Sequence, residues 1–293
     1  MDERLLKDYN YYLKIERRMS PNTAASYSSD IKEFFADCDV KPEEVRLEDV
    51  QGWLSSRSET VSKRTQAREL SALKSFFDYL ILEGIRKENP CESLESPRIG
   101  RYLPDVLSVE EVDRIMESVD CSTPKGLRDR TILEILYGCG LRVSEAVGLK
   151  ISDVFLKEGF VRVTGKGDKQ RIVPLGEVAA DWFRDYLGCR PEEAKPEYSD
   201  TAFLNRNGTP LSRVYIFNMV KTQAIAAGIN KNISPHTFRH SFATHLIENG
   251  ADLRVVQEML GHESILTTEI YTHINSATWQ AAVLEHHPRK RKG

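Results

Sequence analysis

The sequence predicts a mainly α-helical protein with two domains and one small antiparallel sheet. Apolar residues keep helical spacing through the first ~98 residues, with no alternating stretch among them. Two prolines, a glycine and two arginines in the segment 96–106 then break this periodicity. We therefore expect a four-helix domain at residues 1–98, a linker at 99–106, and a mixed α/β domain, mostly helical with a small sheet, at 107–293.

Four segments account for the first domain. Residues 5–13 repeat apolar side chains at helical spacing. Ser20, followed directly by a proline, is typical of a helix N-cap and first turn. A short helix is expected at 47–54, and a long one begins at Ser62 and stops at Gly84.

The second domain begins with a helix at Ser108, where Glu111 occupies the capping-box position. Another helix runs through TILEILYGCG (131–140). Two alternating segments, 160–163 and 171–173, are joined by a glycine-containing turn and predict a β-hairpin.

The rest of the second domain contains one more strand signal. A short strand is expected at Phe203, before a turn at Asn207 and Gly208. The chain from there to about Glu285 has helical spacing, including a last segment, 276–285.

The composition excludes several classes of protein. Hydrophobic residues are 40% and charged residues 29% of the chain, as in ordinary globular proteins. No apolar run approaches the ~20 residues that a membrane span needs, and the charged N-terminus resembles no signal peptide. The five cysteines form no CxxC pair, which argues against disulfides and a zinc knuckle. We expect a cytoplasmic protein with no membrane contact.

Four segments of the second domain hold the candidate functional residues: GLRVSEAVGL (140–149), TGKGDKQRIVPL (164–175), HTFRHSFATHLIENGADLRVVQEMLGH (236–262) and TTEIYTH (267–273). Taken one at a time, their polar residues have ordinary structural interpretations. Arg142 can pair with Glu145 on a helix, Lys166 can lie in an exposed turn, and Tyr271 can pack in a core.

Together these residues suit the transfer of a phosphodiester without a metal ion. Arg142 and Arg239 can neutralise the negative charge that develops on the non-bridging oxygens of the phosphate. Tyr271 can serve as the nucleophile once a base and nearby cations help its phenol to ionise. The ammonium group of Lys166 can donate a proton to the leaving alkoxide.

These motifs resemble those of the tyrosine recombinase (phage integrase) family, in particular its Xer-type site-specific recombinases. The matching catalytic positions are Arg142, Lys166, His236, Arg239, His262 and Tyr271, with Glu145 as the residue that orients Arg142. The histidine of the Leu-Gly-His string precedes the tyrosine by nine residues, as in the family. The N-terminal half and the ending LEHHPR are also similar, so the resemblance covers nearly the whole chain.

The resemblance implies a reaction, a substrate and an assembly. The arginines and His262 would hold the scissile phosphate, and His236 would accept or relay the proton of the tyrosine. Tyr271 would form a 3′-phosphotyrosyl link that a second 5′-hydroxyl resolves, with no metal, cofactor or ATP. Four protomers, alike or of two kinds, would exchange strands between two double-stranded DNA segments through a Holliday junction.

A polar stripe in the first domain is the candidate DNA contact. It consists of Arg64, Arg68, Ser71 and Ser75, which recur at helical spacing opposite an apolar stripe. Such a stripe can meet phosphates or enter a major groove. It can equally be a solvated face. The formal net charge is −3, so DNA contacts must come from basic residues gathered on one face.

Several functions compete with site-specific recombination. A type IB topoisomerase uses the same tyrosine chemistry, and a DNA-binding protein without activity could share the fold. A zinc hydrolase is disfavoured because the histidines 236, 240 and 245 come with no HExxH string. Within recombination, the resolution of chromosome or replicon dimers is favoured over a role in a mobile element.

Overall fold

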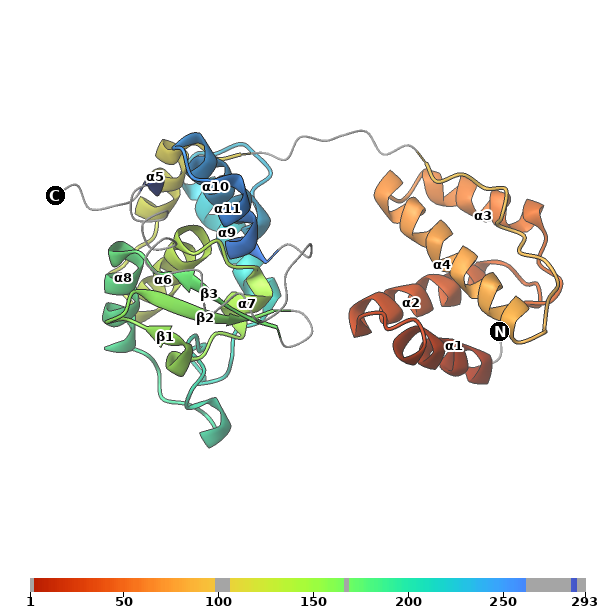
Figure 1. Ribbon diagram of the computed structural model, residues 1–293, viewed down its shortest axis with the longest axis horizontal. Helices are drawn as coiled ribbons and strands as arrows, with labels where there is room; N and C mark the ends of the chain where they lie inside the picture. Colours follow the sequence, from red (N-terminus) through yellow and green to blue (C-terminus); the bar gives the residue numbers. More distant parts are fainter. Residues whose placement is uncertain (1–2, 98–105, 166–168, 262–285, 289–293) are drawn as a thin grey trace. The chain divides into compact units, whose positions relative to one another are not determined.

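The computed structural model describes residues 3–97, 106–165, 169–261 and 286–288. It divides into two compact units, Met1–Tyr102 and Leu103–Gly293, each with a hydrophobic core of its own (Figure 1). Lys166, His262 and Tyr271 lie outside the described residues, as do the segment 276–285 and most of the predicted linker.

The N-terminal unit consists of α1 (Glu3–Ile15), α2 (Pro21–Asp37), α3 (Leu47–Ser58) and α4 (Lys63–Leu82). The predicted helix starts are confirmed by their caps. The hydroxyl of Ser20 accepts from the backbone N–H of Thr23 at 3.1 Å, and that of Ser62 accepts from Thr65 at 3.2 Å. Gly84 follows the end of α4 with a φ of 71°, as expected of a helix stop.

Aromatic side chains fill the core of this unit. Phe76 of α4 packs edge-on against Tyr9 of α1 and Phe35 of α2. Trp53 of α3 packs against Phe34 and donates its indole N–H to Asp37 at 2.9 Å. Each helix therefore contributes at least one aromatic ring to a shared interior, which fixes the surface that α4 leaves exposed.

The C-terminal unit is mostly helical with a three-stranded antiparallel sheet. Among its described residues the α-helices are α5 (Val109–Glu117), α6 (Pro124–Gly138), α7 (Val143–Val147), α8 (Glu177–Leu187), α9 (Arg213–Ala226), α10 (Pro235–Glu248) and α11 (Leu253–Leu260). The strands β1 (Val154–Phe155), β2 (Phe160–Thr164) and β3 (Gln170–Pro174) pair in the order β1-β2-β3. The predicted hairpin is confirmed, and β1 is an additional strand.

Helix α6 lies at the centre of this unit and packs against α8 and α10. It is buried on nearly all sides, including the charged residues Arg128, Asp129, Arg130 and Glu134. These charges pair within the helix, since Arg128 donates to Asp129 at 2.8 Å and Arg130 to Glu134 at 3.0 Å. None of the described helices has the length and apolar character that crossing a membrane requires.

The predicted strand at Phe203 is reduced to an isolated bridge between Leu204 and Pro210. Backbone bonds flank it on both sides, from Asn205 to Thr209 at 2.8 Å and from Leu211 to Phe203 at 3.4 Å. The pairing goes no further because the next residue, Ser212, is the N-cap of α9. The predicted turn forms, with Gly208 at a φ of 69°.

Candidate active site

Arg142 lies at the start of α7, directly after a tight turn. Its backbone N–H donates to Oε2 of Glu145 at 2.7 Å, and its guanidinium donates to Oε1 of the same carboxylate at 3.0 Å. The predicted Arg142–Glu145 pair is therefore present, with the Glu145 carboxylate almost fully buried and 36% of the Arg142 side chain exposed. Glu145 therefore holds both the backbone and the guanidinium of Arg142, while part of the side chain stays exposed.

The turn before Arg142 depends on Gly140. This residue has a φ of 59°, and an added Cβ would lie 2.5 Å from a ring carbon of Phe242. Gly140→Ala should lower the free energy of unfolding of the C-terminal unit by about 3 kcal/mol, from left-handed backbone strain plus overpacking. Chemical denaturation measures the change.

Gly228→Ala is the matched control for this prediction. Gly228 has a φ of 71°, but an added Cβ there would meet nothing within 4 Å. That variant should lose only the backbone contribution of about 1 kcal/mol. Equal losses in the two variants would show that the contact with Phe242 is unimportant.

Arg171 of β3 completes the surroundings of Glu145, and it is not among the site residues predicted from the sequence. Its two terminal nitrogens donate to the two oxygens of Glu145 at 2.7 and 2.8 Å, and its Nε donates to the carbonyl of Met259 at 2.7 Å. A signal for it did exist: Arg171 lies at an inward position of an alternating strand, where β3 otherwise places Val173. A charged residue in an inward register requires a buried partner.

Arg239, one turn into α10, approaches the same cluster. Its guanidinium donates to the carbonyl of Gly140 at 2.7 Å and to the carbonyl of Leu260, and lies 3.8 Å from Glu145. Arg142 and Arg239, 97 positions apart in the sequence, thus flank one carboxylate. His236, on the first turn of α10, is exposed.

The last turn of α11 accepts hydrogen bonds from all three arginines. The carbonyls of Met259, Leu260 and Gly261 each accept from a different guanidinium, and Arg142 donates to Gly261 at 3.2 Å. Gly261 ends the helix in the left-handed conformation, with a φ of 65°. In the sequence His262 follows directly, so the cluster fixes the residue that precedes it.

The charges of the cluster shift the ionisation of its members. Burial opposes ionisation of Glu145, but the hydrogen bonds and charges of Arg171 and then Arg142 hold the pKa of that carboxyl below its usual value. Burial, followed by the charge of Arg142, lowers the pKa of Arg239 to about 10. Three guanidinium groups share one carboxylate, so the cluster is net positive and suited to an anion such as a phosphodiester.

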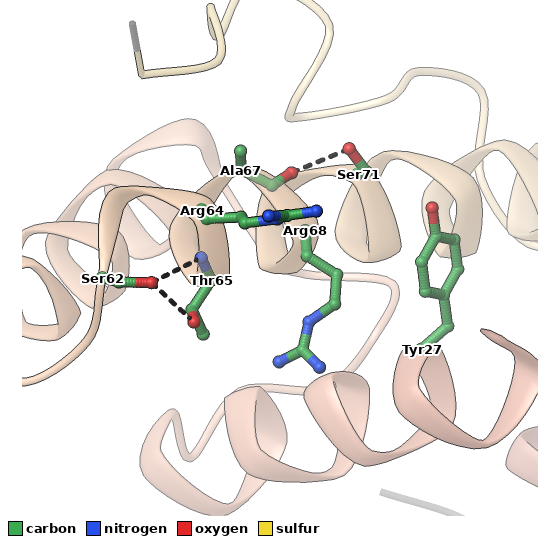
Figure 2. A pocket seen from close by; sticks show the side chains of 7 residues that line it. All are labelled: Tyr27, Ser62, Arg64, Thr65, Ala67, Arg68 and Ser71. Atoms are coloured by element: carbon green, nitrogen blue, oxygen red, sulfur yellow. Dashed lines mark hydrogen bonds between the residues drawn. The ribbon is translucent and has the colours of Figure 1, made fainter. Parts of the chain in front are cut away.

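The predicted DNA-contacting residues lie on α4, in the other unit. Arg64, Arg68 and Ser71 line an open pocket together with Tyr27, Ser62, Thr65 and Ala67 (Figure 2). Arg64 has no hydrogen-bond or ion-pair partner within the described part of the chain. Ser75 does not line this pocket, and its hydroxyl oxygen is buried.

Arg68 is held by a buried carboxylate on the neighbouring helix. Its guanidinium donates to Asp30 of α2 at 2.9 Å, and the Arg68 side chain is 43% exposed while that of Asp30 is 3% exposed. Burial raises the pKa of Asp30 from 3.8 to about 6. The positive charge of Arg68 opposes this rise, and the negative charge of Glu69 adds to it.

The raised pKa of Asp30 makes the stability of the N-terminal unit depend on pH. Between about pH 4 and 6 the folded state binds more protons than the unfolded state, so stability should fall as pH rises through that window. In the wild type we expect this effect to lower the free energy of unfolding by about 1–2 kcal/mol between pH 4 and pH 7, and Asp30→Asn should abolish it. Denaturant titrations at pH 4 and pH 7 test it, and an unchanged slope in the variant would contradict it.

Comparison with known proteins shows the family. Residues 105–278 match the Phage integrase family, and residues 6–84 match the N-terminal SAM-like domain of phage integrases. The chain belongs to the phage integrase family.

Relatives in the phage integrase family are similar over nearly their whole length. The chain is 45% identical to tyrosine recombinase XerD of Chlorobaculum tepidum, with 97% of this chain and 96% of the relative covered. It is 43% identical to tyrosine recombinase XerD of Listeria monocytogenes, with coverages of 97% and 99%. The predicted family resemblance is therefore confirmed.

A solved structure supports the fold. The XerH site-specific recombinase bound to a palindromic difH substrate, in a post-cleavage complex, matches with a TM-score of 0.70 and 26% identity. The match covers 94% of this chain and 83% of that one. The predicted fold class, a helical N-terminal unit and a mostly helical unit with a small antiparallel sheet, is confirmed.

Proposed function

We propose that this protein is a site-specific DNA recombinase that cleaves and rejoins strands through a 3′-phosphotyrosyl intermediate. The observation that carries the proposal is the net positive cluster in which Arg142 and Arg239 flank Glu145 beside the end of α11. The relatives named tyrosine recombinase XerD support the same reaction.

In the proposed reaction, Arg142 and Arg239 bind the scissile phosphate. Their guanidinium groups neutralise the charge that builds up on its non-bridging oxygens, and their fixed positions reduce the cost of reorganisation. His262, placed next to Gly261 in the sequence, adds a further donor to the phosphate. Glu145 contacts no substrate and keeps Arg142 oriented.

Tyr271 is the proposed nucleophile. Its phenolic oxygen forms a bond to phosphorus while the bond to the 5′-oxygen breaks, and His236 accepts the phenolic proton. Lys166 donates a proton to the leaving 5′-oxygen. The phosphotyrosine retains the energy of the broken ester, so attack by another 5′-hydroxyl reverses the step without ATP, metal or cofactor.

Two domains would share the DNA. We assign residues 1–98 to a core-binding domain, 99–106 to a linker and 107–293 to the catalytic domain. In the first domain, Arg64, Arg68 and Ser71 are the proposed contacts, since they surround one open pocket and Arg64 has no protein partner in the described residues. Ser75 stays a prediction, with its hydroxyl oxygen buried.

The proposed assembly is a tetramer, of one or two kinds of recombinase, on two DNA segments. The solved structures of the XerH site-specific recombinase bound to a difH substrate support our proposal that the substrate is a specific site on double-stranded DNA. Similarity to XerD proteins favours the resolution of chromosome or replicon dimers, in the cytoplasm where that DNA lies.

Covalent trapping tests the proposed function. Genomic fragments carrying a nick near each candidate site let the short cleaved product diffuse away, so the phosphotyrosyl adduct accumulates. Denaturing isolation of the protein with its DNA, followed by sequencing of the trapped ends, should give one recurring sequence. Random ends would favour DNA relaxation without site specificity, and the absence of any adduct would refute strand cleavage.

A further inference from the structure

Each nitrogen of the Arg171 guanidinium donates a hydrogen bond within the protein. Its two terminal nitrogens donate to Glu145, its Nε donates to the carbonyl of Met259, and only 6% of the side chain is exposed. Because each of its three nitrogens already donates to the protein, this buried side chain presents little surface to a substrate. Any effect of Arg171 on the reaction must therefore act through the groups it holds.

The first group held by Arg171 is the carboxylate of Glu145. Each oxygen of that carboxylate accepts from Arg171 and also from Arg142, once from the guanidinium and once from the backbone N–H. A two-pronged bond fixes both the plane and the rotation of a carboxylate. Without it, the carboxylate could turn and would no longer aim the Arg142 guanidinium in one direction.

The second group held by Arg171 is the end of α11. Besides the bond to Met259, its side chain packs beneath Gly261, where an added Cβ would lie 3.3 Å from Cδ of Arg171. Arg171 belongs to β3, the strand that follows Lys166 in the sequence. The Arg171 side chain thus connects β3 to the carboxylate that orients Arg142 and to the end of α11.

We propose that Arg171 is a positioning residue for strand cleavage, which holds Glu145 and the last turn of α11 in the geometry that phosphate transfer requires. This inference rests on the proposed function. It predicts a defect in the rate of cleavage without a matching defect in DNA affinity. A buried ion pair with only a structural role would instead change stability alone.

Arg171→Lys is the decisive variant, because lysine keeps the positive charge but cannot bridge both carboxylate oxygens and the Met259 carbonyl at once. We expect the Kd for a nicked DNA site to stay within about 2-fold of the wild-type value. The single-turnover rate of adduct formation at saturating protein should fall about 10–100-fold, as for other residues that orient a reacting group.

Arg130→Lys is the matched control. Arg130 is also buried in the C-terminal unit, pairs with Glu134 and donates to the carbonyl of Met116, but it takes no part in the cluster. The two variants should lose comparable thermal stability, and Arg130→Lys should cleave at the wild-type rate per folded molecule.

A double-mutant cycle with Glu145→Gln shows whether Arg171 acts through Glu145. In the wild type Glu145→Gln should slow cleavage, whereas in the Arg171→Lys protein it should slow cleavage much less. The proposal is overturned if Arg171→Lys cleaves at the wild-type rate, if both lysine variants slow cleavage equally, or if the two substitutions are independent.

The wild-type protein separates this proposal from the proposed function. A wild type that forms no adduct overturns both. A wild type that forms the adduct, beside an Arg171→Lys variant that forms it as fast, overturns the role of Arg171 and leaves the recombinase function in place.

Discussion

Tyr271→Phe should bind its DNA site with wild-type affinity and form no covalent protein–DNA adduct. The substitution removes only the phenolic oxygen, which is the proposed nucleophile, and leaves every positive charge of the arginine cluster in place. We expect adduct formation to fall below detection, by at least about 10³-fold. Gel-shift titration measures the affinity, and denaturing gels of the nicked substrate measure the adduct.

The control for this experiment is Tyr11→Phe, because the Tyr11 ring on α1 is 64% exposed and lies outside the proposed machinery. That protein should form the adduct at the wild-type rate. An adduct that survives denaturation in Tyr271→Phe would assign the nucleophile to another residue.

Lys166→Ala should cleave ordinary DNA about 10²–10⁴-fold more slowly than the wild type, because the leaving 5′-alkoxide would lack a proton donor. In a substrate with sulfur in place of the 5′-bridging oxygen, the leaving group is a thiolate, which needs no proton. On that substrate Lys166→Ala should approach the wild-type rate. Single-turnover cleavage of the two substrates measures the rescue.

Two further variants make the sulfur rescue specific. Arg142→Ala should stay slow on both substrates, because the proposed contribution of Arg142 is charge stabilisation. Lys169 is an exposed lysine directly before β3, and Lys169→Ala should show no selective gain in rate on the sulfur-containing substrate. Equal rescue of Lys166→Ala and Arg142→Ala, or rescue of neither, would remove the assignment of Lys166 as the general acid.

Features encoded by neighbouring residues could be predicted from the sequence. Ser20, Ser62 and Ser108 each begin a helix by accepting a backbone N–H three residues on, and such caps are visible in four residues of sequence. Alternation likewise predicted the pairing of β2 with β3. These signals need no knowledge of what lies across the fold.

Contacts between distant residues could not be predicted in this way. Arg171 reaches Met259 over 88 positions, and Arg142 reaches Gly261 over 119. The motifs nominated Arg142, Glu145 and Arg239 but could not show that carbonyl groups of α11 would meet each arginine. The stripe on α4 shows the same limit. Its helical spacing predicts which residues share a face but not that Arg68 bonds the Asp30 carboxylate of another helix.

The arginine cluster also links the folding of the C-terminal unit to the salts around it. Three guanidinium groups, one carboxylate and the carbonyl end of a helix leave an excess of positive charge that folding must bring together. An inorganic anion that binds there stabilises the folded chain by mass action. If Arg142 and Arg239 bind the scissile phosphate as proposed, the same anion would occupy its place. We therefore expect phosphate or sulfate in a buffer to have two opposite effects, stabilising the fold and competing with DNA for the site.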